Sequence, residues 1–181
     1  METKMNQVDA LRLDCAKRQK KGLHFILASV IIWVAITVTH LTNLPIETKN
    51  IVTFCCAAPL LPLAWAISRM LHIDFEGKGN PLTQLGVIFS VNQILYILIA
   101  MWVFSAVPEK MLMVYTMIFG AHLMPYSWLY RSKSYMVLSM AIPIVALMVG
   151  LMAEPYVLAA MMVGVEAGFS MSLVIENRNI K

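Results

Sequence analysis

Long apolar runs are the feature that most constrains this chain. Six stretches of about 20 mostly apolar residues follow one another along its 181 residues, and a helix of that length crosses the roughly 30 Å of hydrocarbon in a bilayer. The strands of a membrane barrel would instead be about 10 residues long and alternate in polarity. We therefore expect six membrane-spanning helices, over residues 23–42, 51–71, 85–107, 110–130, 134–152 and 155–175.

The composition agrees with this expectation. The chain is 60% hydrophobic and only 13% charged, whereas a soluble domain averages about 45–50% apolar and about 25% charged residues. A chain of this size cannot hide such an excess in one small core. A soluble domain, a disordered chain and a nucleic-acid binder are poor interpretations, and the predicted fold class is all-α: a polytopic membrane protein built as a six-helix bundle.

The apolar runs and their connectors predict one domain with two short tails. We expect a basic cytoplasmic tail at 1–22, a single transmembrane domain at 23–175 and a cytoplasmic tail at 176–181. Short connectors force consecutive helices to lie antiparallel. Proline removes a backbone donor, so the second helix is expected to be irregular and the fourth to be kinked; the prolines concerned are Pro59, Pro62 and Pro125.

The basic tail has two interpretations. Val8, Leu11 and Cys15 recur at helical spacing, which favours a helix on the membrane surface, but a solvated and partly frayed tail fits equally well. We expect no cleavable signal peptide, because the first apolar run is longer than a typical signal sequence and no small-x-small site follows it.

The cations set the orientation. With the N-terminus in the cytoplasm, twelve Lys and Arg residues lie on the inner side and only Lys49 and Lys110 on the outer side, as the positive-inside rule predicts. Both termini are therefore expected to be cytoplasmic. The inner cations are Lys4, Arg12, Lys17, Arg18, Lys20, Lys21, Arg69, Lys78, Arg131, Lys133, Arg178 and Lys181.

Glu166 is the most informative polar residue. It lies about 11 residues into the sixth run, which is near the bilayer centre. A carboxyl group there must be protonated, pair with a cation or line a wet cavity. One interpretation is a proton or cation site, or an anchor for a ligand; the other is a protonated glutamic acid that joins two helices by a hydrogen bond.

Three further polar residues share this depth. His122, Asn92 and Gln93 fall within roughly 8 Å of Glu166 along the membrane normal, which would allow one polar layer, although their lateral positions do not follow from the sequence. Interhelical hydrogen bonding of the two amides, and a histidine satisfied within the core, are the structural alternatives.

An aromatic face passes through the fourth run. Tyr115, Phe119, His122 and Tyr126 recur at spacings of four, three and four, so they share one side of a helix. They could line a ligand pocket or form a packed aromatic seam. Ser29, Trp33, Thr37 and His40 form a weakly polar stripe on the first run.

The last run carries a second pattern. Small residues recur at spacing four, as in surfaces that allow close helix contact, on a face directed away from Glu166. We expect this face to pack tightly while the acid meets the polar layer. The small residues are Ala160, Gly164, Gly168 and Ser172.

Catalytic and metal motifs are missing from the sequence. The chain has no phosphate-binding loop, no Gly-x-Ser-x-Gly and no His-Glu-x-x-His. Cys15, Cys55 and Cys56 have no zinc-site spacing and are expected to be reduced thiols. We predict no metal, no cofactor and no catalytic residue, and the chain is more plausibly a non-enzyme.

Two resemblances add to this picture. Residues 20–33, KKGLHFILASVIIW, resemble the opening of a family of small uncharacterised bacterial membrane proteins, and the overall size is similar. This resemblance implies a multi-pass protein of the bacterial inner membrane and brings no known activity. The architecture is also similar to the substrate-capture subunits of energy-coupling-factor vitamin importers, but their Ala-x-x-x-Ala docking motif is absent, since Ala28 is followed by Ile32 and Ala35 by Thr39.

The preferred functional hypothesis is a small-solute permease or a ligand-binding membrane subunit. Its partners would be the lipid bilayer, a small-molecule ligand, and a second copy or another membrane subunit, and we expect no nucleic acid. The alternatives are an accessory or scaffold protein and a membrane-embedded enzyme acting on lipid. The predicted ligand or proton site comprises Glu166, His122, Asn92, Gln93, Tyr126, Tyr115 and Phe119.

Overall fold

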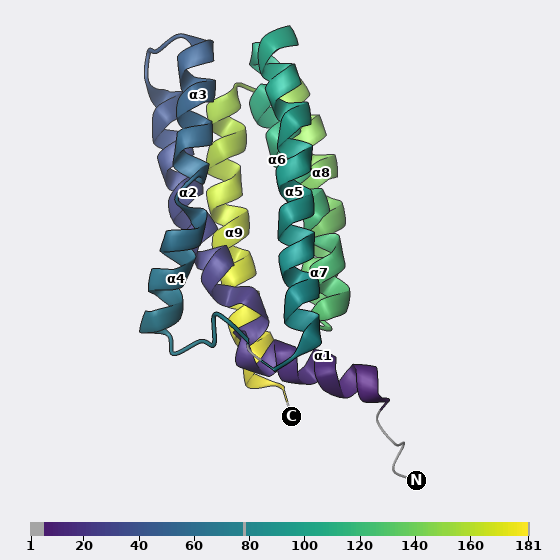
Figure 1. Cartoon of the computed structure of the whole chain (residues 1–181). Helices are drawn as coiled ribbons and strands as arrows, with labels where there is room; N and C mark the ends of the chain where they lie inside the picture. Colours follow the sequence, from purple (N-terminus) through teal and green to yellow (C-terminus); the bar gives the residue numbers. More distant parts are fainter. Residues whose placement is uncertain (1–5, 78, 181) are drawn as a thin grey trace.

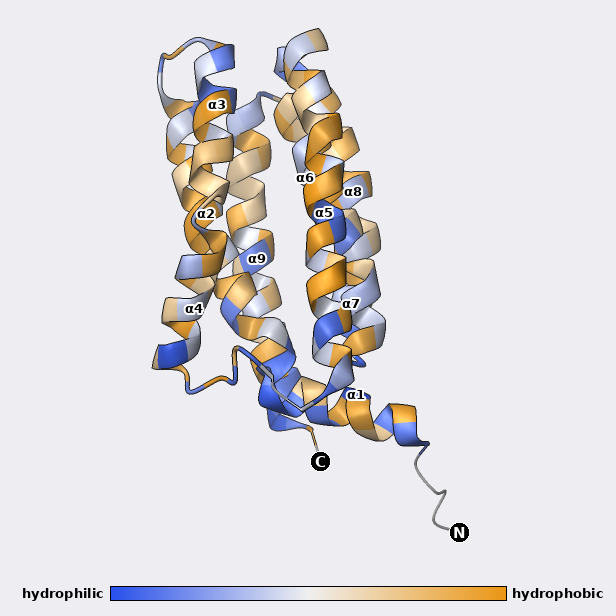
Figure 2. Cartoon of the chain, in the orientation of Figure 1, coloured by the Kyte–Doolittle hydropathy of each residue, from blue (hydrophilic) through white to orange (hydrophobic). Residues whose placement is uncertain are grey.

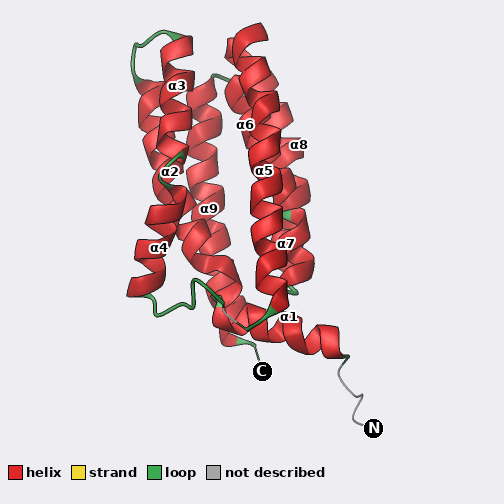
Figure 3. Ribbon diagram, in the orientation of Figure 1, coloured by secondary structure: helices red, strands yellow, loops and turns green. Residues whose placement is uncertain are grey.

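The computed structural model describes residues 6–77 and 79–180, and all regular secondary structure in these two ranges is helical (Figure 3). The predicted all-α class is thus confirmed. The helices are α1 Gln7–Arg18, α2 Leu23–Leu41, α3 Ile46–Ala57, α4 Leu60–Met70, α5 Pro81–Ala106, α6 Met111–His122, α7 Met124–Leu129, α8 Lys133–Met152 and α9 Pro155–Arg178. Short 3₁₀ turns, Lys20–Gly22 and Pro108–Lys110, precede α2 and α6.

Five helical segments in the described ranges are long and apolar enough to cross a membrane. They are Lys20–Leu41, Ile46–Met70, Pro81–Ala106, Lys133–Met152 and Pro155–Arg178. The remaining predicted run, 110–130, contains two shorter helices, α6 and α7, which are separated at Leu123.

Prolines explain both interruptions. The segment Ile46–Met70 changes from α3 to α4 at Ala58 and Pro59, and the change from α6 to α7 comes just before Pro125. A proline has no backbone N–H, and its ring crowds the carbonyl one turn earlier. The helices therefore bend at the places where their hydrogen-bond ladder loses a donor.

The long helices run side by side in a bundle (Figure 1). α2 packs most extensively against α9, and α6 packs most extensively against α8. Contacts of α8 with α9 join the α2–α9 pair to the α6–α8 pair. α3 and α4 lie along α2, and α5 lies along α6. The N- and C-terminal ends of the described chain lie at the same end of the bundle (Figure 1).

α1 crosses that end of the bundle (Figure 1). Its Cys15 and Ala16 are buried, and the Asn80 side chain donates to the Leu11 carbonyl oxygen at 2.8 Å. From Gln7 onwards, the stretch predicted as a tail is therefore a docked helix. Three of the predicted inner cations, Lys4, Lys78 and Lys181, lie outside the described residues.

The outer surface of the bundle is apolar. Only Ala100 and Val103 of the 26 residues in α5 are buried, and Trp102 on the same helix is 68% exposed. Figure 2 shows hydrophobic colour along most of the long helices, and hydrophilic colour around α1 and in shorter patches on α4, α5 and α9. Such a largely apolar exterior is unusual in water and suits a lipid environment.

α9 reverses the expected roles of its two faces. The face with Glu166 packs within the chain, together with Leu158, Met162, Phe169 and Leu173. A Cβ atom added at Gly164 or Gly168 would meet no atom within 4 Å. Gly164 and Gly168 are therefore on the outside of the bundle, because α2 occupies the other face of α9. Ser172 of the same stripe instead contacts α8, where its hydroxyl lies 2.5 Å from that of Ser134.

Candidate functional site

Glu166 lies at the centre of the α2–α9 contact. It is the twelfth residue of α9, which begins at Pro155, and its side chain is completely buried. No salt bridge joins it to a Lys, Arg or His side chain in the described part of the chain. A carboxyl group in this position is isolated from both water and cations.

Ser29 on α2 is the hydrogen-bond partner of Glu166. The Ser29 hydroxyl donates to Glu166 Oε2, and it also lies 2.8 Å from the Ile26 carbonyl oxygen. A hydroxyl has a single proton to donate, so Ser29 cannot donate to Glu166 and to Ile26 at the same time. A protonated Glu166 would donate its own proton to the Ser29 hydroxyl, and Ser29 could then donate to the Ile26 carbonyl oxygen. Glu166 Oε1 has no hydrogen-bond partner among the described residues.

The predicted aromatic face lies in one line along α6 and α7. The ring centroids of Phe119 and His122 are 5.4 Å apart, and those of His122 and Tyr126 are 6.1 Å apart. Trp33 of α2 contacts this face, with its centroid 6.1 Å from Tyr115 and 5.8 Å from Phe119.

His122 occupies the last residue of α6, at the break before Pro125. Its Nδ1 bonds to the Phe119 carbonyl oxygen, and its side chain is partly buried. The imidazole is therefore anchored to its own helix.

Tyr126 connects this face to α5. Its hydroxyl donates to the Gly86 carbonyl oxygen at 2.9 Å and lies 2.6 Å from the Ser90 hydroxyl. Of the two predicted amides on α5, Asn92 is exposed and Gln93 is partly buried. No hydrogen bond joins either amide to Glu166 or His122 within the described ranges. The matched depth of these residues is thus not accompanied by direct contact.

Tyr135 on α8 bridges the aromatic face and α9. Its ring centroid lies 6.0 Å from that of Tyr126 and 4.7 Å from that of Phe169, which is three residues beyond Glu166. A continuous series of rings therefore runs from His122 through Tyr126 and Tyr135 to the helix that carries Glu166. We call this series the aromatic ladder.

Two surface grooves of the described chain lie along the α2–α9 seam and at one end of the bundle. One, of about 260 Å³, is lined by Val34, Thr37, Val38, Ala160 and Val163 on the outer side of the α2–α9 seam. The other lies at the end of the bundle near α1. Neither groove is lined by Glu166 or His122.

Sequence reasoning singled out five residues of this arrangement and missed others. The five are Glu166, Tyr115, Phe119, His122 and Tyr126. Ser29 and Trp33 appeared only as members of a polar stripe on the first run, and Tyr135 and Phe169 were not considered. A search for hydroxyl and aromatic residues at the depth of Glu166 would have found Ser29 and Phe169, but no local pattern identifies their partners.

Comparison with known protein families identifies a family that covers most of the chain. The model of a family of unknown function, DUF7010, matches residues 8–176, which extend from the second residue of α1 to the last turn of α9. None of the curated proteins and none of the solved structures matches the chain.

Proposed function

The chain belongs to DUF7010, a family of unknown function, and from this premise we propose that it is a bacterial inner-membrane permease, or ligand-binding membrane subunit, whose central group is Glu166. The observation that carries the proposal is the complete burial of this carboxyl group, whose Oε1 has no hydrogen-bond partner in the described part of the chain. Ionisable groups at membrane depth are costly to maintain, so their presence favours a functional role.

The proposed topology has six crossings. Five segments are long and apolar enough on their own, and the sixth crossing is the broken pair α6 and α7, which spans Met111–Leu129. Nineteen residues at 1.5 Å each cover about 29 Å. Broken helices occur in transporters where irregular backbone is buried in protein, which fits a break that lies beside His122.

The proposed orientation places α1 in the cytoplasm. The end of the bundle that carries α1 also carries Arg131, Lys133 and Arg178 (Figure 1), whereas Lys49 and Lys110 belong to the opposite connectors. This asymmetry supports both termini inside. A charged, membrane-impermeant thiol reagent applied to intact cells checks it, using Lys49→Cys and Lys133→Cys in a cysteine-free chain.

The chemistry of Glu166 favours a proton or a small cationic solute. A buried carboxylate without a cation is strongly unfavourable, so the group is stable when it carries a proton or when a cationic ligand reaches Oε1. The aromatic ladder supports this class of ligand, because aromatic rings attract cations through their π faces. His122 and Tyr126 would then stand at the far end of the path from Glu166.

Proton flux tests the proposal directly. The full chain is reconstituted into liposomes that contain a trapped pH-sensitive dye, and a potassium diffusion potential is applied. We expect the parent protein to accelerate acidification of the lumen and Glu166→Gln to reduce the rate at least about tenfold, which corresponds to about 1.4 kcal/mol in the barrier. Methylammonium added inside serves as the cationic-solute probe.

Ser29→Ala is the matched control for structure. It removes the hydroxyl that contacts Glu166 but leaves the carboxyl group, so it is expected to lower stability by about 1 kcal/mol and to retain flux. Equal rates for the parent chain and Glu166→Gln, with either probe and with unchanged thermal stability, would contradict the proposal. That result would instead favour the scaffold hypothesis, in which Glu166 only joins helices.

A further inference from the structure

A second groove lies at the end of the bundle that carries α1. It has a volume of about 520 Å³ and opens between α1, α7 and the start of α8. Its lining combines cations with apolar side chains and contains no carboxylate. The residues used below are Arg12, Met124, Trp128, Arg131, Lys133 and Met136; we call this site the basic groove.

The basic groove carries uncompensated positive charge. Arg131 and Lys133 are exposed, and neither takes part in a salt bridge in the described part of the chain. Arg12 differs, because its guanidinium lies 3.0 Å from Asp9. The groove therefore presents two positive charges that no carboxylate neutralises, next to a third cation that is already paired.

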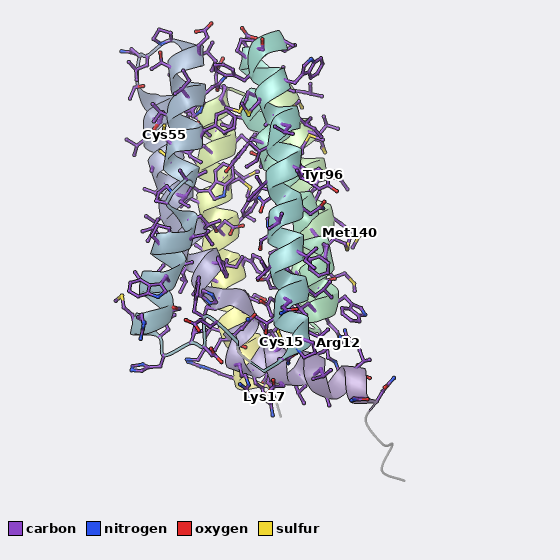
Figure 4. The ribbon with its side chains drawn as sticks, viewed as in Figure 1. Arg12, Cys15, Lys17, Cys55, Tyr96 and Met140 are labelled. Atoms are coloured by element: carbon purple, nitrogen blue, oxygen red, sulfur yellow. The ribbon has the colours of Figure 1, made fainter. Side chains whose placement is uncertain are left out.

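Arg12 builds the rim of the groove. Its Nε donates to the Trp128 carbonyl oxygen at 2.8 Å, and its guanidinium carbon lies 4.4 Å from the centroid of the Trp128 ring. Figure 4 shows Arg12 at the end of the bundle, on α1. This contact fixes α1 against α7 and holds the indole at the groove, at the level where tryptophan is enriched in membrane proteins.

Arg131 holds a backbone conformation that favours glycine. Its φ is 49°, and the next residue, Ser132, donates its N–H to the Ser127 carbonyl oxygen at 3.0 Å. This is the helix-ending pattern in which glycine is usual at the left-handed position. A long cationic side chain kept there, at a conformational cost, points to a role for the charge.

The floor of the groove is apolar and continues along α8. Met124 and Met136 line it and are both exposed, and one turn further along α8 lies Met140, which is also exposed (Figure 4). Flexible methionine side chains adapt well to hydrocarbon chains. A ligand with an anionic head and an apolar tail would match both parts of the site.

We propose that the basic groove binds the headgroup phosphate of an anionic phospholipid. Arg131 and Lys133 contact the phosphate, and an acyl chain lies along Met124, Met136 and Met140. A net-negative headgroup is preferred to a zwitterionic one, because the groove offers no carboxylate to a choline ammonium. Basic pockets beside membrane helices are suited to this kind of lipid.

This site is separate from Glu166, which lies in the middle of α9 and does not line the basic groove. Glu166→Gln is therefore expected to bind lipid as the parent chain does. A failed flux experiment and a failed lipid experiment would be distinguishable.

Lipid binding is measured on the full chain in a neutral detergent. Native mass spectrometry counts bound dioctanoyl phosphatidylglycerol, in parallel with dioctanoyl phosphatidylcholine and with inorganic phosphate as a competitor. We expect phosphatidylglycerol to be retained in preference to phosphatidylcholine. Loss of one cation is expected to weaken its binding about fivefold, from the usual contribution of a single Lys or Arg near an anionic membrane surface.

Matched variants distinguish lipid binding at the basic groove from diffuse attraction to surface charge. Arg131→Gly removes the charge and relieves the backbone, so it should lose lipid without a lower melting temperature. His72→Gly is its control, since His72 has a φ of 52° and its successor donates to Ser68 O at 2.9 Å in the same helix-ending pattern, away from the groove. Lys133→Gln and the exposed Lys17→Gln form a second pair.

The outcomes decide the proposal. Selective loss of phosphatidylglycerol in Arg131→Gly and Lys133→Gln, with His72→Gly and Lys17→Gln unchanged, supports it. Equal retention of the two lipids, or an equal loss in Lys17→Gln, overturns it in favour of diffuse attraction. Displacement of the lipid by an equal concentration of inorganic phosphate overturns the lipid assignment in favour of a free anion.

Discussion

The ammonium group of Lys21 lies 2.7 Å from the Glu176 carboxylate. Lys21 lies where the chain enters α2, and Glu176 lies in the last turn of α9. The second carboxylate oxygen accepts from the Ser134 N–H at 3.0 Å and from its hydroxyl at 2.6 Å. One carboxylate thus joins the start of α2, the start of α8 and the end of α9.

Breaking this pair on one side should destabilise the chain. The Lys21 side chain is only 7% exposed, so Glu176→Gln leaves a mostly buried ammonium without its counter-charge, and we expect a loss of about 1–3 kcal/mol. In the double variant Lys21→Met/Glu176→Gln, the loss should be smaller than the sum of the single losses. Thermal unfolding in detergent, followed by circular dichroism, measures these values; strict additivity would mean that the two groups are not coupled.

Helix packing predicts opposite effects at two glycines, one in the α6–α8 contact and one on the outer face of α9. A Cβ atom at Gly120 would lie 2.6 Å from Ile142 Cγ2 and 2.7 Å from Pro143 Cδ, so Gly120→Ala should cost about 1–3 kcal/mol through overpacking. Gly164→Ala meets no atom within 4 Å and should gain up to about 1 kcal/mol from helix propensity. Melting temperatures of the two variants check this contrast, and equal values would show that α6 and α8 are less closely packed.

Local patterns predicted much of this fold. Run length identified five long apolar helical segments, and Pro59 and Pro125 marked the places where helices are interrupted, because both signals depend only on neighbouring residues. The shared face of Phe119, His122 and Tyr126 followed from helical spacing in the same way.

Contacts across the bundle did not follow from the sequence. Ser29 and Glu166 are 137 residues apart, and Lys21 and Glu176 are 155 apart, so neither pair leaves a local signal. Depth in the membrane could be estimated for Asn92, but the direction of its side chain depends on how α5 is rotated. In the structure that rotation places Asn92 on the surface.

The hydrogen bonds that dock α1 on the bundle predict that the stability of the fold decreases in acid. The Asp14 carboxylate accepts from Asn80 and from Arg18, each at 2.9 Å, and these hydrogen bonds, that of Asn80 first, lower its pKa from the ordinary value of 3.8. A depressed folded-state pKa stabilises the fold above the unfolded-state value, and the stabilisation is lost as the pH falls through the folded-state pKa.

We therefore expect the melting temperature of the parent chain to fall below about pH 4 more steeply than that of Asp14→Asn. Near neutral pH the variant should be the less stable of the two. Melting curves over a pH series in one detergent measure the difference. Parallel pH profiles for the two proteins would show that Asp14 does not contribute to the docking of α1.

Cys15 offers a direct probe of the same docking. It is buried in α1, and burial raises the pKa of its thiol from 9.0 to about 11. A pKa two units higher leaves about a hundredfold less reactive thiolate near neutral pH. In a chain with Cys55 and Cys56 replaced by serine, we expect N-ethylmaleimide to modify Cys15 at least about a hundredfold more slowly in the folded protein than after denaturation in dodecyl sulfate.

Asn80→Ala should accelerate this reaction. The Asn80 amide donates both to the Leu11 carbonyl oxygen at 2.8 Å and to Asp14, so its removal loosens α1 without altering the residues beside Glu166. The rate of Cys15 modification should then rise several-fold, while the circular dichroism of the helices changes little. Rapid labelling in the parent chain would mean that α1 leaves the bundle end readily, whereas an unchanged slow rate in Asn80→Ala would assign the docking to the Arg12–Trp128 contact.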